Sequence, residues 1–68
     1  MPTKKLSRLL KDARAGQKLS LRALGRKSRV HFVTIQKIES GQSSPSIRTL
    51  KRLAVALGLD AAVLLAAA

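Results

Sequence analysis

The sequence predicts an all-α protein that forms a single domain over residues 1–68. Its apolar residues are almost entirely Leu, Ala, Val and Ile, and Leu and Ala favour helix over strand. No stretch alternates apolar and polar residues for long enough to form a half-buried strand. With 68 residues, of which 46% are hydrophobic, the chain can form one modest core and is unlike a disordered sequence.

The first two helices are predicted from apolar spacing and capping residues. The first, over about residues 4–15, has apolar residues at helical spacing: Leu6, Leu9, Leu10 and Ala13. Gly16 ends it. Ser20 is a favourable N-cap for a second helix that reaches about residue 27. Gly25 inside this helix costs about 1 kcal/mol relative to Ala, which indicates that another helix approaches closely.

A short break at residues 28–30 precedes a third helix over about residues 31–40, in which Ile35 and Ile38 point inward. Gly41 suits the position after the end of this helix. The polar loop that follows ends at Pro45, which disfavours helix in the preceding residue.

Ser46 is predicted to cap a fourth helix that extends to about residue 57. One face of this helix is apolar: Ile47, Leu50, Leu53, Ala54 and Leu57. Gly58 ends the helix, and Asp60 caps a short fifth helix to about residue 65. We expect the tail at residues 66–68 to be frayed.

Charge indicates the class of partner. Fourteen Lys and Arg residues against three acidic residues give a net charge of +11, whereas a magnitude of about 2 to 8 suffices for the solubility of a small domain. So large an excess attracts polyanions. Nucleic acid is the first candidate partner, and an anionic membrane surface is the second.

Catalytic, metal and membrane functions are not expected. The chain has no Cys and a single histidine, His31, which lies at the start of a predicted helix as a cap or surface residue. The three acidic residues, Asp12, Glu39 and Asp60, are far apart, and no phosphate-binding glycine motif is present. The most apolar stretch, residues 53–68, is interrupted and shorter than the ~20 residues that span a bilayer. We therefore expect no enzyme, no cofactor and no metal, and a cytoplasmic, nucleoid-associated location.

Two short helices that flank a three-residue break form the layout of a helix-turn-helix at about residues 20–40. The second helix of such a pair lies in the major groove of DNA. Its face opposite the inward isoleucines is predicted to contact bases: Phe32, Val33, Gln36 and Lys37. Gln36 can pair with adenine and Lys37 with guanine, and Val33 or Phe32 can touch a thymine methyl group. Packing of Phe32 into the core remains an equal alternative.

Residues 6–65 resemble the Cro/phage-repressor (Xre-type) helix-turn-helix domain. The best-matching piece is VHFVTIQKIESGQSSPSIRTLKRLAVALGL, and the family pattern is V-S-x-x-T-I-S-x-I-E-x-G, a polar loop, P-S, an apolar-periodic helix and A-L-G. The residues that fit are Val30, Thr34, Ile35, Ile38, Glu39, Gly41, Pro45, Ser46, Leu50, Leu53, Ala54, Ala56, Leu57 and Gly58. The resemblance implies a five-helix, lambda-repressor-like domain that binds operator DNA, commonly as a homodimer. It also implies an ion pair between Glu39 and Arg14.

Several residues depart from the family pattern. Leu21 stands where Gln is usual, Gly25 where Ala is usual, and His31 where Ser or Thr is usual. Arg29 replaces the usual Gly and must adopt the turn conformation at some strain. The loop after the third helix is neutral rather than basic. The expected contacts to the DNA backbone are Ser20, Arg22, Arg26, Lys27, Arg29, Gln42, Ser43 and Arg48, whereas the other basic residues of the first and fourth helices are expected to be mostly solvated.

These observations predict a small transcriptional regulator, in the form of a repressor that binds a near-palindromic operator. The expected homodimer uses the fifth helix, through Val63, Leu64 and Leu65, because a small bundle cannot bury all of them. One alternative is an antitoxin or adaptor module that binds a partner protein as well as DNA. Another is a basic peptide that folds only on membranes or coats DNA without sequence preference.

Overall fold

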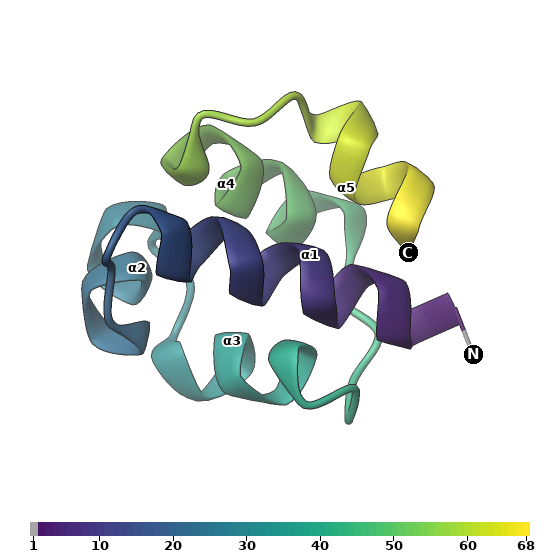
Figure 1. Cartoon of the computed structure of the whole chain (residues 1–68), viewed down its shortest axis with the longest axis horizontal. Coiled ribbons are helices and arrows are strands. Elements are labelled where there is room, and N and C mark those ends of the chain that lie inside the picture. The colour runs from purple at the N-terminus through teal and green to yellow at the C-terminus, as the bar shows by residue number, and fades with distance from the viewer. Residues whose placement is uncertain (1) are drawn as a thin grey trace.

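Five helices make up the fold in the computed structural model, which describes the backbone of residues 2–68 and the side chains from Lys5 onward. They are α1 (Pro2–Gly16), α2 (Leu21–Ser28), α3 (Phe32–Glu39), α4 (Ile47–Leu57) and α5 (Ala61–Ala67). In Figure 1, α1 crosses the front of the molecule, with α3 below it and α4 and α5 above it. Helix α1 packs against α3 and α5, and α2 packs against α3 and α4. The prediction of an all-α, five-helix domain is confirmed.

The helix ends follow the predicted capping residues. The side chains of Ser20, Ser46 and Asp60 each accept a hydrogen bond from a backbone N–H group in the first turn of the helix that follows. Gly41 and Gly58 adopt positive φ angles of 77° and 70° at the ends of α3 and α4, a conformation that glycine tolerates without steric cost. Short local signals therefore fix where these helices begin and end.

All five helices contribute to one core. The large side chains that are almost fully buried are Leu6, Leu10, Leu24, Ile35, Ile38, Leu50, Leu53 and Leu64. Burial of a side chain of this size stabilises the fold by about 1.5 to 3 kcal/mol. Among the described residues, no buried side-chain nitrogen or oxygen lacks a hydrogen-bond partner. None of the described helices combines the length and the apolar character that a bilayer crossing requires.

The structure corrects two expectations about the last helix. Leu64, predicted as part of a contact between two copies, has no exposed surface and belongs to the core of its own chain, so it cannot form such a contact. Helix α5 continues to Ala67, which is 5% exposed, so the predicted fraying of residues 66–68 is wrong as far as Ala67. The reason is the same in both cases. Residues 64 and 67 lie three positions apart and form the inner face of α5.

A third correction concerns the start of α4. Ile47 was predicted on the same apolar face as Leu50 and Leu53, but its side chain is 61% exposed whereas theirs are buried. It is the first residue of α4 and lies beyond the edge of the core that Leu50 and Leu53 enter. Helical spacing alone does not show how far along a helix the core extends.

Candidate nucleic-acid interface

Helix α3 presents a stripe of exposed residues to solvent. Ile35 and Ile38 are 0% and 1% exposed, so they attach the inner side of the helix to the core. On the outer side, Val33 is 36% exposed, and Gln36 and Lys37 are also exposed. These three side chains offer an apolar group, an amide and an ammonium group, which together match the methyl groups, donors and acceptors of the major groove.

Phe32 lies neither in the core nor free on the surface. Its side chain is half-buried, and the Arg22 guanidinium carbon lies 4.4 Å from the centroid of its ring. The imidazole of His31 stacks against the same ring, with centroids 5.0 Å apart and planes inclined by 20°. A guanidinium over an aromatic face is attracted by the ring quadrupole, and its N–H donors can still form hydrogen bonds at the edge. The ring therefore links the first turn of α2 to the start of α3.

The start of α3 is also fixed by its own cap. His31 is the N-cap, and its Nδ1 atom accepts a hydrogen bond of 3.1 Å from the backbone N–H of Val33. The family pattern has Ser or Thr at this position, and the imidazole performs the same capping role. This capping requires Nδ1 to be the unprotonated nitrogen of the ring.

Gly25 permits the close packing of α2 on the start of α3. A Cβ atom at this position would lie 3.0 Å from the carbonyl oxygen of Val30 and 3.3 Å from the backbone nitrogen of Phe32. Both atoms belong to the backbone and cannot move away as a flexible side chain could. The prediction that this glycine marks a close approach is confirmed, and the partner is the turn together with the first residue of α3.

The turn between α2 and α3 depends on Ser28 and Arg29. The hydroxyl of Ser28, which is buried, donates to the carbonyl oxygen of Leu24 at 2.7 Å and accepts from the N–H of Val30 at 3.2 Å. Arg29 adopts the left-handed conformation with a φ of 61°, as its position in the turn predicted. Its side chain is exposed.

A bidentate ion pair orients the other end of α3. The Arg14 Nε and Nη2 atoms donate to Glu39 Oε2 and Oε1 at 2.7 and 3.0 Å, and Nη1 donates to the carbonyl oxygen of Leu19 at 2.8 Å. The two side chains are only 16% and 8% exposed. The hydrogen bond to Glu39 raises the pKa of Arg14 above its ordinary value, against the effect of burial. Arg14 thereby connects α1, the end of α3 and the segment that leads into α2.

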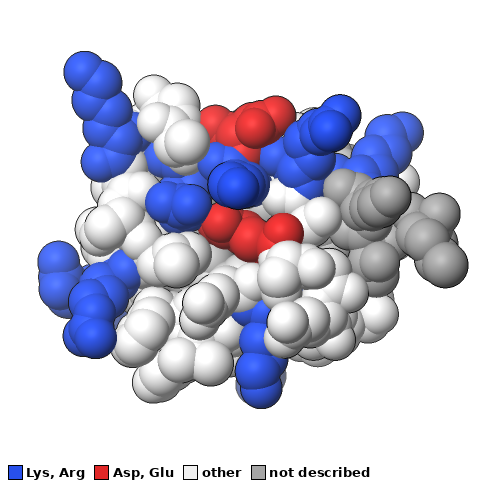
Figure 2. Space-filling model, turned by 60° about the horizontal axis from the view of Figure 1, so that its bottom comes forward, with Lys and Arg blue, Asp and Glu red and all other residues white. Residues whose placement is uncertain are grey.

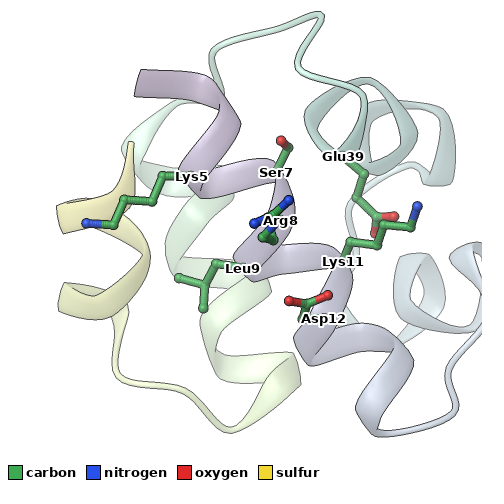
Figure 3. Close-up of a pocket in the computed structure, with 7 residues that line it drawn as sticks. All are labelled: Lys5, Ser7, Arg8, Leu9, Lys11, Asp12 and Glu39. Carbon is green, nitrogen blue, oxygen red and sulfur yellow. The ribbon is translucent and has the colours of Figure 1, made fainter. Parts of the chain in front are cut away.

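An open hollow borders this end of α3 on the side of α1 (Figure 3). It is lined by three basic residues of α1, which are Lys5, Arg8 and Lys11. The other lining residues are Ser7, Leu9, Asp12 and Glu39. The sequence predicted that the basic residues of the first helix are mostly solvated, and it gave no reason to connect these three with α3. Their spacing of three residues was the available signal, because it aligns them along one side of the helix.

The residues predicted to contact the DNA backbone are spread over α2, the turn after it, the loop after α3 and the start of α4. Ser20 and Arg22 lie at the start of α2, beside the start of α3. Gln42 and Ser43 lie in the loop between α3 and α4, and Arg48 is in the first turn of α4. Lys27 and Arg29 line a second hollow with residues of α4, and Arg26 is exposed in the last turn of α2. That these residues contact the DNA backbone stays a prediction.

Basic side chains outnumber acidic ones on the side of the molecule on which α3 lies. In Figure 2 this side comes forward. Lys and Arg side chains stand across its upper part, at its left and at its lower edge, acidic side chains lie between the upper ones, and the remaining coloured area is uncharged. Within residues 5–68, His, Asp and Glu side chains do not gather in any group of three that could bind a metal ion. What this surface offers is positive charge around the polar and apolar side chains of α3.

Comparisons with known proteins agree with this geometry. The model of the helix-turn-helix family HTH_3 matches residues 10–64. Among solved structures, an HTH_3 family transcriptional regulator from Vibrio cholerae is similar to this chain, with 31% sequence identity and a TM-score of 0.86. The match covers 94% of this chain and 36% of the Vibrio protein, so the chain spans about a third of that regulator. Comparison with curated proteins gives no significant match.

Proposed function

The chain belongs to the HTH_3 helix-turn-helix family, and from that premise we propose that it binds double-stranded DNA sequence-specifically as a small transcriptional regulator. One observation carries the proposal. Val33, Gln36 and Lys37 form an exposed stripe on α3, whose inner side is buried and whose two ends are fixed by the His31 cap and by the pair formed by Glu39. A rigid helix with an exposed polar stripe is what entry into the major groove requires.

Each residue of the stripe has a separate role. Gln36 pairs with adenine through its amide, and Lys37 donates to guanine acceptors. Val33 contacts a thymine methyl group. Phe32 positions Arg22, because the Arg22 guanidinium lies over the Phe32 ring. This position directs the guanidinium toward the DNA strand at the start of α3.

The backbone contacts come from elements around α3. The N-terminus of α2, with Ser20 and Arg22, faces a phosphate, since helix N-termini favour anions. Further contacts are proposed from the rest of the rim: Arg26, Gln42, Ser43, Arg48 and the α1 residues Lys5, Arg8 and Lys11. These contacts fix the register of the protein on the duplex and contribute no sequence preference.

We further propose a homodimer that represses transcription from a near-palindromic operator. Two copies related by a two-fold axis would place their α3 helices about 34 Å apart, one helical turn of DNA. The apolar side chains that α5 exposes can form the contact: Val63 is 45% exposed and Leu65 is 36% exposed. A DNA-binding role implies a cytoplasmic, nucleoid-associated location.

Selection of bound duplexes from a random DNA pool tests this function. We expect enrichment of a consensus with two inverted half-sites whose centres lie about one helical turn apart. The Val63→Asp variant is a control, because an unpaired charge in the contact should disrupt the dimer and leave a single half-site enriched. A pool that shows no enriched sequence after repeated rounds would contradict the proposal.

A further inference from the structure

We propose that a second basic surface, where α2 meets α4, binds an acidic segment of a partner protein. We call it the α2–α4 surface. It is a hollow lined by Lys27, Ser28, Arg29, Lys51, Arg52 and Val55. The sequence predicted that Lys27 and Arg29 contact the DNA backbone, and that stays a prediction. The α2–α4 surface assigns both residues to a protein partner, together with Lys51, Arg52 and Val55, which no proposed DNA contact uses. This inference therefore goes beyond the proposed function.

The α2–α4 surface lies away from the outer stripe of α3. None of the residues that line it belongs to α3. Within α2, Gly25 faces the start of α3, and Lys27 follows two positions later. Two residues correspond to about 200° around a helix axis, so Lys27 lies on nearly the opposite side of α2. A duplex bound by α3 therefore leaves this surface accessible.

The positive charge of the surface favours an anionic partner. Four cationic side chains line the hollow, and no acidic residue is among its lining residues. All four are exposed. The four positive charges repel one another when the surface is unoccupied. A segment rich in Asp and Glu would offset this repulsion and raise the rate of association.

Val55 favours a protein segment over a second stretch of DNA. Its side chain is 81% exposed and follows Lys51 by one helical turn on the outside of α4. The backbone of a duplex offers only small deoxyribose C–H groups between its phosphates, which would cover little of a valine surrounded by cations. An acidic peptide that carries a leucine or another aliphatic residue has a larger apolar group, and it can cover Val55 while its carboxylates meet the four basic side chains.

Arg29 is the cation that the turn between α2 and α3 contributes to this surface. It stands in the left-handed region at a φ of 61°, where glycine is unstrained and an L-residue is not. Its exposed side chain forms no hydrogen bond or ion pair with any described residue. Lys18, after the end of α1, also has a positive φ of 57°, so this backbone conformation belongs to the turn and does not itself indicate a partner. Arg29 contributes to the proposal as an exposed cation beside the other three.

The probe for this proposal is a synthetic acidic peptide with leucine at helical spacing, titrated into ¹⁵N-labelled protein and followed by NMR. We expect the amide shifts to change at residues 27–29 and 51–55 and to stay constant along α3. Replacement of the peptide leucines by alanine should weaken binding about tenfold, which corresponds to loss of one buried apolar anchor. An equal affinity of both peptides would overturn the role of Val55.

Charge-matched variants separate this surface from the net charge of the molecule. Lys51→Gln with Arg52→Gln should weaken peptide binding about tenfold or more. Lys5→Gln with Lys11→Gln removes the same charge from the α1 hollow and should have a far smaller effect. Equal losses in the two variants would show that the peptide binds by net charge alone.

The Arg29→Gly variant tests the proposal in two directions at once. Glycine removes the strain at this position, so the urea midpoint of unfolding should rise or stay the same, while peptide affinity falls. A role in folding alone would lower the midpoint instead.

Three results would overturn the proposal: no peptide binding, peptide-induced shifts centred on α3, or a random-sequence duplex that occupies the α2–α4 surface more tightly than the peptide.

Discussion

Helices α3 and α5 are similar in length and in attachment but present opposite chemistry. Helix α3 has 8 residues and α5 has 7, and each attaches to the core through residues on one side: Ile35 and Ile38 in α3, and Leu64 and Ala67 in α5. The outer side of α3 carries an amide and an ammonium group. Helix α5 has no charged residue and exposes only aliphatic side chains.

The two helices also differ in what fixes them. Polar contacts constrain α3 at both ends, through the His31 cap and through the bidentate pair of Arg14 and Glu39. Beyond its Asp60 cap, α5 depends on buried apolar side chains. The contrast indicates a division of labour. A helix that must match base edges needs a fixed orientation, whereas an apolar contact between copies tolerates small shifts.

The largest expected difference between the two regions is their response to salt. For a dimer that contacts about 6 to 10 phosphates, raising the salt concentration from 50 to 200 mM should reduce DNA affinity by a factor of about 10³ to 10⁵. Dimerisation through α5 should change little or strengthen, because apolar association does not depend on ion pairing. Fluorescence anisotropy for DNA binding and sedimentation for dimerisation, over the same salt range, measure the two effects. Salt-insensitive DNA binding would remove the distinction between the regions.

The next effect concerns the ion pair that orients α3. Glu39→Ala and Arg14→Ala should each reduce the free energy of unfolding by about 3 to 5 kcal/mol, because each leaves a nearly buried charge unpaired. The double variant should lose less than the sum of the two. Urea denaturation of the four proteins completes the cycle, and Asp12→Ala, at an exposed acid on α1, is the control that should change stability little. Small, additive losses would show that α3 is positioned without this pair.

Adjacent residues of α5 should separate folding from association. Leu64→Ala removes a fully buried side chain and should cost about 2 to 5 kcal/mol of folding stability. Val63→Ala, next to it but 45% exposed, should change the stability of the monomer by about 0.5 kcal/mol or less and should weaken the dimer. Urea denaturation at low protein concentration and sedimentation at high concentration distinguish the two. A Val63→Ala protein that dimerises normally would place the contact elsewhere.

Local sequence signals predicted the helix boundaries and most of the core. The caps at Ser20, Ser46 and Asp60 and the glycine ends of α3 and α4 involve residues a few positions apart, so the sequence contains all that is needed to identify them. Ile35 and Ile38 were predicted in the core because they lie among polar neighbours at helical spacing. The apolar run of α5 has no polar side to mark its orientation, which is why Leu64 was assigned to the surface.

The candidate site was predicted less completely, because parts of it join distant residues. The stack of Arg22 on Phe32 depends on the path of the turn between α2 and α3, which spacing does not specify. Lys27 and Arg29 meet Lys51 and Arg52 only because α2 packs against α4. In contrast, the exposed stripe on α3 follows from the inward positions of Ile35 and Ile38.

The most direct test of the account compares Lys37→Ala in α3 with Arg22→Ala in α2. Each variant removes one positive charge, and the two helices are neighbours. Both are measured on the selected operator, on operators changed at single base pairs, and on random DNA at two salt concentrations. Lys37→Ala should cost about 1 to 3 kcal/mol on the operator and relax the preference at one base position in each half-site. Arg22→Ala should weaken binding to all sequences alike and reduce the salt dependence. If Lys37→Ala weakens all DNA equally and Arg22→Ala changes the sequence preference, α3 is not the helix that recognises the bases.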